Sequence, residues 1–296
     1  MTMRFWTIPV LAGLLLAAMS GVGFAIPSLN GPTGIVTVPT AYVAPDKTLD
    51  YALSYQKFKI KNLVASGGMY GITEESEDLT SWSLQALTGI SKQAELWTAY
   101  SRVNDGKSSN IWGLGGKVQL TKEPEEAASL AVGGSYQRWQ DAFVEQISVT
   151  GLDGLPVVVS ETTADATVWT GYLVATKDFT PMKGESWEWG PGAGTRMLGS
   201  AGLIYKKIDN SGSMSLTRPF AGVEFIGPSG ASLGLEYRWK DNDIDKKAVF
   251  SAVLRYKFSP KVTAELGTTN STPVGTGLDN QDIFVRVGYT LPLKGY

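Results

Sequence analysis

The sequence has no cysteine and no histidine among its 296 residues. Without cysteine, no disulfide can hold the chain, so its fold must rest on burial and hydrogen bonding. Without histidine, Ser-His-Asp and Cys-His catalysis, histidine zinc sites and an imidazole pH switch are excluded. We therefore predict no enzyme activity, no cofactor and no metal site. A barrel enzyme that uses carboxylates alone is the one catalytic alternative left open.

Long apolar runs are missing after residue 25, so the rest of the chain contains no candidate transmembrane helix. The first 25 residues contain Arg4, an apolar run from Phe5 to Ala18 and small residues up to Ala25. This order is typical of a secretory signal peptide, and it predicts export and cleavage after Ala25. An uncleaved membrane anchor is the alternative, because this segment is about long enough to span a bilayer.

An excess of positive charge is also missing. Without the predicted signal peptide, 25 basic and 28 acidic residues remain, a net charge of −3. Proteins that bind nucleic acid present a basic face to the phosphate backbone. We therefore expect no nucleic-acid partner.

The chain is rich in glycine and aromatics instead, with 34 glycines, 9 tryptophans and 12 tyrosines. Apolar and polar residues alternate in about twelve segments, most of them near the 9 to 11 residues that a tilted membrane strand needs. We predict an all-β fold over 47–296, a transmembrane antiparallel up-and-down β-barrel. The predicted strands are 49–58, 82–90, 94–103, 110–120, 129–137, 165–177, 198–208, 218–226, 232–240, 248–258, 262–269 and 282–291.

Alternation alone does not prove a membrane barrel, because the strands of a soluble β-sandwich alternate in the same way. Connection lengths favour the barrel, since short turns and longer loops alternate along the chain. This alternation places both ends of 47–296 on the same side of the barrel. The connection 178–197 is the exception, unless a further strand lies between 143 and 164. A soluble periplasmic or secreted β-sandwich that binds a ligand is the alternative.

The segment 26–46 differs from the strands because prolines and glycines interrupt it. Proline removes a backbone donor and glycine adopts unusual angles, so this stretch cannot join a central strand. It could lie inside the polar lumen as a plug, or cover the periplasmic mouth as a lead-in to the first strand. The candidate plug motif is Gly31, Pro32, Thr33, Gly34, Pro39 and Thr40.

The stretch "GPTGIVTVPTAYVAPDKTL" over 31–49 resembles the opening of YjbH-like outer-membrane proteins. The match rests on Gly31, Thr33, Gly34, Ile35, Pro39, Thr40 and Ala41. The resemblance implies an outer-membrane location in a Gram-negative-type bacterium and a link to exopolysaccharide secretion. Because the chain is much shorter than full-length members of that family, it resembles the barrel module alone. Expected partners are outer-membrane lipid, lipopolysaccharide and a polysaccharide or other polar permeant.

Charged residues fall on the predicted inner face of consecutive strands. Two interpretations are open: an ion-pair network that fills a narrow barrel, or a lining for a polar or charged permeant. Cations outnumber carboxylates, which predicts weak anion selectivity. The sequence therefore predicts a channel or accessory component of envelope transport. The candidate lumen-lining residues are Lys117, Glu224, Glu236, Arg238, Lys240, Arg255, Lys257, Glu265 and Arg286.

Overall fold

The computed structural model describes most of the chain beyond the predicted signal peptide, and residues 1–25 lie outside the described part. Within the described part, no helix is long and apolar enough to cross a membrane. The described residues are 27–29, 31–66, 71–104, 108–123, 127–150, 156–179, 195–209, 213–240, 247–271 and 277–293.

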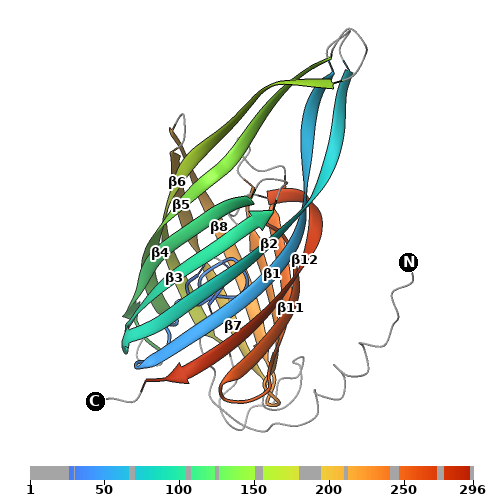
Figure 1. The fold of residues 1–296 in the computed structure, drawn as a ribbon. Coiled ribbons are helices and arrows are strands. Elements are labelled where there is room, and N and C mark those ends of the chain that lie inside the picture. The colour runs from blue at the N-terminus through green and yellow to red at the C-terminus, as the bar shows by residue number, and fades with distance from the viewer. Residues whose placement is uncertain are drawn as a thin grey trace, which may run out of the picture.

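Twelve antiparallel strands form one closed barrel, in which each strand pairs with its neighbours along the chain and β1 pairs with β12 (Figure 1). The predicted up-and-down barrel and its strand number are confirmed, and the two-sheet sandwich is wrong. The strands are β1 (Thr48–Ser66), β2 (Gly71–Ser91), β3 (Ala94–Asn104), β4 (Ser108–Thr121), β5 (Ser129–Thr150), β6 (Pro156–Asp178), β7 (Arg196–Asp209), β8 (Ser213–Ile226), β9 (Ala231–Arg238), β10 (Val249–Lys257), β11 (Val262–Ser271) and β12 (Gly277–Pro292).

Alternation decides which side chains face outward. On β1, Tyr51, Leu53 and Tyr55 are 41%, 56% and 49% exposed, whereas Ser54 and Gln56 are buried. The same period of two places mostly apolar residues outside on the other strands, while inward positions hold polar and charged residues together with apolar ones such as Phe220 and Phe284. The outer surface is therefore apolar, and the lumen contains both polar and apolar groups.

Two hairpins extend far beyond the other strands, at the end of the barrel away from the last residues of β12 (Figure 1). The predicted strand bounds leave 59–81 and 138–164 as loops. This prediction is wrong, because strands continue through most of both ranges. β1 and β2 pair as far as Ser66 and Gly71, and β5 and β6 as far as Thr150 and Pro156. β5 and β6 pair directly with each other, so no further strand lies between them among the described residues. The acidic run Glu74–Asp78 concealed part of the first extension, whereas apolar residues such as Ile147 and Val157 lie on the second.

The buried core of the protein lies inside the lumen, where residues 27–29 and 31–46 fold back from the start of β1. We call this segment the plug. Its Ile35, Val36, Val38 and Ala41 pack against inward side chains of the barrel. Ile35 fits against Gly222 and Gly234, at each of which an added Cβ would lie 2.5 and 2.6 Å from the Ile35 side chain. The plug and the barrel wall are thus fitted to each other.

Candidate functional site: the plug and the lumen wall

Glu236 of β9 holds the tip of the plug. Its carboxylate accepts hydrogen bonds from the backbone N–H groups of Val36 at 3.0 Å, Thr37 at 2.9 Å and Val38 at 3.1 Å. The Thr37 hydroxyl donates to the same carboxylate. Glu236 is only 2% exposed and forms no ion pair with any described residue. Converging peptide N–H dipoles therefore bind this carboxylate directly.

The sequence of the plug makes this convergence feasible. Gly34 and Pro39 form an isolated bridge, and the Ile35 N–H donates to the Val38 carbonyl at 3.2 Å. This closes a tight loop whose next three N–H groups point the same way. A Cβ at Gly34 would lie 2.3 Å from the Val38 carbonyl oxygen, so the approach requires glycine.

Glu95 of β3 binds the plug backbone before and after this loop. It accepts hydrogen bonds from the Thr33 N–H at 3.0 Å and the Ala44 N–H at 2.7 Å. Lys117 of β4 lies 3.0 Å from the Glu95 carboxylate, and both side chains are 0% exposed. The Lys117 ammonium also donates to the carbonyls of Thr33 at 3.2 Å and Thr40 at 3.0 Å. One ion pair thus satisfies both donors and acceptors of the plug backbone.

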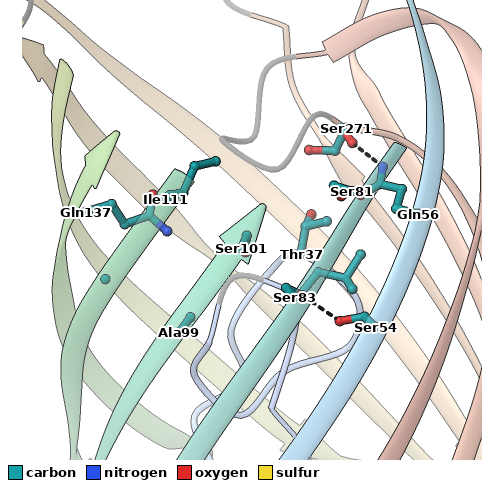
Figure 2. Close-up of a pocket in the computed structure, with 12 residues that line it drawn as sticks. Thr37, Ser54, Gln56, Ser81, Ser83, Ala99, Ser101, Ile111, Gln137 and Ser271 are labelled. Carbon is teal, nitrogen blue, oxygen red and sulfur yellow. Dashed lines mark hydrogen bonds between the residues drawn. The ribbon is translucent and has the colours of Figure 1, made fainter. Parts of the chain in front are cut away.

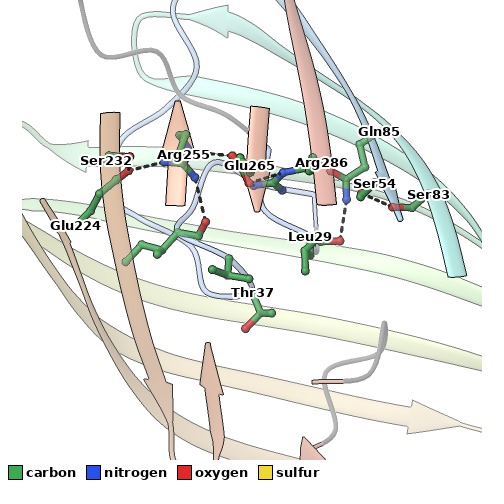
Figure 3. Close-up of polar contacts among 12 residues, drawn as sticks. Leu29, Thr37, Ser54, Ser83, Gln85, Glu224, Ser232, Arg255, Glu265 and Arg286 are labelled. Atoms are coloured by element: carbon green, nitrogen blue, oxygen red, sulfur yellow. Dashed lines mark hydrogen bonds and ion pairs between the residues drawn. The ribbon is translucent and has the colours of Figure 1, made fainter. Parts of the chain in front are cut away.

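A row of alternating charges crosses the opposite wall (Figure 3). Arg255 of β10 pairs with Glu224 of β8 and with Glu265 of β11, whose Oε1 lies 2.7 Å from Nε. Arg286 of β12 donates to Glu265 at 2.8 Å. Arg255 also donates to the Ile35 carbonyl at 3.1 Å, so the row is connected to the plug.

Two uncharged side chains complete the contacts to the plug backbone. Gln85 of β2 donates to the Leu29 carbonyl at 2.7 Å, and the Thr176 hydroxyl of β6 accepts from the Ala41 N–H at 2.8 Å. Strands β2, β3, β4, β6, β9 and β10 therefore all contact the main chain of the plug. Recognition depends on the path of the backbone more than on the plug side chains.

A smaller contact lies where the plug meets the turns of the barrel. The Tyr42 hydroxyl donates to Glu123 at 3.3 Å, and Glu123 also accepts from the Asp178 N–H at 3.0 Å and pairs with Lys177 at 2.7 Å. Burial raises the pKa of Glu123, but hydrogen bonds from Lys177, Asp178 and Tyr42 and the Lys177 charge outweigh it and lower the pKa below its usual value. Burial and the Glu123 charge raise the pKa of Tyr42. We call this contact the rim latch.

Most of the nine candidate lumen residues lie in the interior. Lys117, Glu224, Glu236, Arg238, Glu265 and Arg286 are buried, and Arg255 and Lys257 are partly buried. Lys240 differs, because it follows the last residue of β9 and is exposed, outside the buried lining. The six candidate plug residues, Gly31, Pro32, Thr33, Gly34, Pro39 and Thr40, are all buried. Gly31 has a φ of 109° and lies against the Trp97 ring.

The sequence interpretation missed Glu95 and Gln85, although both lie on predicted strands. Their neighbours carried the signal, because Leu96 and Leu84 occupy outward positions and alternation then turns Glu95 and Gln85 inward. It also missed Asp50, Lys206 and Arg218, which are buried as well. Within the described part of the chain, no group of three or more acidic side chains could hold a metal ion.

Comparison with solved structures places this architecture among barrel proteins. The translocator domain of autotransporter NalP from Neisseria meningitidis has a TM-score of 0.51 and 13% identity over 83% of this chain and 88% of that chain. This similarity shows the fold alone, a closed β-barrel of the outer-membrane type. The contacts of this chain place its plug inside the lumen.

Two other solved structures have lower scores. The KdgM porin in complex with disordered oligogalacturonate gives a TM-score of 0.48 and 11% identity, covering 82% of this chain and 98% of that one. An outer membrane channel from Pseudomonas putida F1 gives 0.47 and 12%, covering 85% and 98%. The sequence matches no protein-family model and no curated protein.

Proposed function

We propose that this protein is an outer-membrane channel that its own plug holds closed, and that it serves the export of exopolysaccharide or another polar solute. The observation that carries the proposal is the pair of buried carboxylates, Glu95 and Glu236, that bind the plug backbone inside the lumen. A segment that only filled the lumen would not require carboxylates placed to accept hydrogen bonds from its backbone. They indicate a segment that has a defined docked state.

The outer surface supports a membrane location. Aromatic rings from neighbouring strands contact one another on the outside of the barrel, with centroid distances of 5.4 Å for Trp82 and Tyr100 and 4.7 Å for Tyr136 and Trp169. Trp112 contacts Tyr136 at 5.7 Å. Such aromatic groups favour the interface between lipid and water, and a closed barrel leaves no strand edge unpaired in lipid.

The lumen supports a polar permeant. When the plug leaves, Glu95, Glu236, Lys117 and Arg255 lose their backbone partners and become groups that line a water-filled path. Carboxylates accept hydrogen bonds from hydroxyl groups, and lysine and arginine donate to them. An export path for a hydrated polymer requires such groups. The assignment to exopolysaccharide rests on the resemblance of 31–49 to YjbH-like proteins.

Deleting 26–46 while keeping the signal peptide tests whether the plug closes the channel. We expect a folded barrel, recognised by its resistance to unfolding in detergent until heated, with a several-fold higher conductance in planar bilayers. The matched control keeps the plug and replaces the outward Ser215 by alanine, which should leave the conductance low. A folded, plug-free barrel with unchanged conductance would overturn the proposed closure.

A second experiment tests the export role. Cells that lack the chain should secrete less exopolysaccharide, and the intact chain should restore secretion. Normal secretion without the chain would refute the export of this polymer but leave the gated channel standing.

A further inference from the structure

A polar cavity lies between the plug and the wall formed by β1 to β5, and its empty space of about 580 Å³ includes open solvent (Figure 2). Ser101 lies near the last residue of β3 and Ile111 near the first residue of β4, so the cavity faces the end of the barrel that carries the long hairpins. The lining residues are Leu29, Thr37, Ser54, Gln56, Ser81, Ser83, Ala99, Ser101, Ile111, Gly113, Gln137 and Ser271.

The lining combines eight uncharged polar side chains with Leu29, Ala99, Ile111 and Gly113. Five serines, one threonine and two glutamines provide hydroxyl and amide groups, and the lining includes neither a charged nor an aromatic side chain. Each hydroxyl can donate one hydrogen bond and accept two, and each amide can do both. This set suits a ligand whose own groups are hydroxyls, and it offers no counter-charge to an ionic one.

The wall keeps the cavity open because its inward positions are small across neighbouring strands. Ser54 of β1 pairs in register with Ser83 of β2, which pairs with Ser101 of β3. In the next row, Ala99 of β3 pairs with Gly113 of β4. Inward positions elsewhere in the barrel hold side chains as large as arginine and phenylalanine. The space therefore results from residue choice at these positions.

Several of these polar groups retain unused hydrogen-bonding capacity. The Ser54 and Ser83 hydroxyls bond to each other at 2.7 Å, which leaves acceptor lone pairs on both. The Gln56 amide nitrogen donates to the Ser271 carbonyl at 2.9 Å, which leaves its oxygen available. Ser81 is 5% exposed, and no described residue bonds to its hydroxyl. This hydroxyl can therefore bond to water or to a ligand in the cavity.

Charged groups near the cavity are not part of its lining. Arg286 is the neighbour of Ser54 in register on β12; its Nε and Nη2 donate to Glu265, and its Nη1 is buried without a hydrogen-bond partner among the described residues. Glu236 lies behind Thr37 and is bonded to the plug backbone. An anionic or cationic ligand would therefore be desolvated in the cavity without a direct partner of opposite charge.

We infer that this cavity binds a neutral, polyhydroxylated ligand, an uncharged oligosaccharide, on the plug surface that faces the hairpins. The inference deepens the proposed function and rests on it for the route by which the ligand reaches the lumen. Thr37 joins the two sites, because it lines the cavity while its N–H and hydroxyl bind Glu236. The ligand therefore contacts the same loop that closes the channel.

Calorimetric titration of the full chain in detergent with maltotriose tests this inference. We expect saturable binding to the wild type and at least tenfold weaker binding to Ser101→Leu, whose side chain fills the cavity. Ser81→Ala removes a hydroxyl that has no partner among the described residues, so it should fold normally and weaken binding several-fold. The matched controls are Ser215→Leu and Ser215→Ala on the exposed outer face of β8, which should bind as the wild type does.

Two further probes separate the ligand classes. Trigalacturonate supplies a comparable but anionic sugar, and a short polyethylene glycol supplies a neutral chain without internal hydroxyls; both should bind at least tenfold more weakly. Absent maltotriose binding, equal binding to Ser101→Leu, or preference for either other probe would overturn the inference. The titration uses the closed barrel, whereas the proposed function is tested by the conductance of the plug-free one, so either can fail without the other.

Discussion

Glu95 and Glu236 perform the same task in two different electrostatic settings. Both are buried carboxylates that bind backbone N–H groups of the plug, and they lie on strands β3 and β9. Glu95 is paired with Lys117, whereas Glu236 is surrounded by three N–H groups and a hydroxyl without an ion pair among the described residues. Peptide N–H groups and a hydroxyl thus bind one carboxylate directly, whereas an ammonium group shares in binding the other.

The difference between the two settings predicts how much plug docking is weakened when each carboxylate is replaced. A buried ion pair that loses one partner leaves an uncompensated charge, which is expensive. A carboxylate held by neutral donors leaves only unsatisfied N–H groups when it is replaced, and these cost less. Because the chain has no cysteine, a single cysteine introduced at the buried Ala41 can report plug release through its rate of labelling by a water-soluble maleimide.

The largest effect is expected for Glu95→Gln. The substitution leaves the Lys117 ammonium buried without its counter-ion, which should destabilise the docked plug by about 3–5 kcal/mol. Labelling at position 41 and bilayer conductance should both rise strongly. Adding Lys117→Met should reverse much of the increase, because the pair is then replaced by neutral groups. No reversal in the double variant would contradict the ion-pair explanation.

Glu236→Gln should have a smaller effect of the same sign. The carboxamide keeps one acceptor oxygen but turns an NH₂ group toward N–H donors, at a cost of about 1–3 kcal/mol. No single removal of a cation should restore docking, since Glu236 has no ion-pair partner among the described residues. Rescue by Lys117→Met in this background would show that the two carboxylates do not act separately.

Gly222→Ala tests steric fit at the plug without changing charge. The new methyl group would meet the Ile35 side chain, at an expected cost of about 1–3 kcal/mol in plug docking. Ile35→Ala in the same chain should relieve the clash and restore slow labelling. Gly171→Ala is the matched control, because an added Cβ there meets nothing within 4 Å. Equal labelling of both glycine variants would count against the predicted contact.

The rim latch should give the smallest effect, and it should depend on pH. The folded pKa of Glu123 lies below its unfolded value, near 4.3 for a free glutamate. Its contribution is therefore complete above the unfolded pKa and is lost as pH falls through the folded pKa. Labelling at position 41 should rise slightly over that acidic range, and Glu123→Gln should remove this rise. An unchanged acid profile in the variant would exclude Glu123 as its source.

The sequence predicts the barrel better than it predicts the closed lumen. Alternation in segments such as 232–238 reveals both the strand and the inward position of Glu236. The partner of Glu236 could not be read in the same way, because it is the plug backbone about 200 residues away and has no side-chain pattern. The long hairpins were missed because runs such as Glu74–Asp78 lack regular alternation, although apolar residues between 143 and 164 gave a partial signal.

The plug contacts join residues that are far apart in the sequence, and this separation determines when the lumen can close during assembly. Ala44 bonds to a carboxylate 51 residues later, and Val36 bonds to one 200 residues later. Contacts this far apart form late, because the intervening chain must first be ordered. We expect the plug to dock only after β9 and β10 have joined the sheet. A barrel that stalls before this point would keep its plug segment outside the lumen, where a protease can reach it.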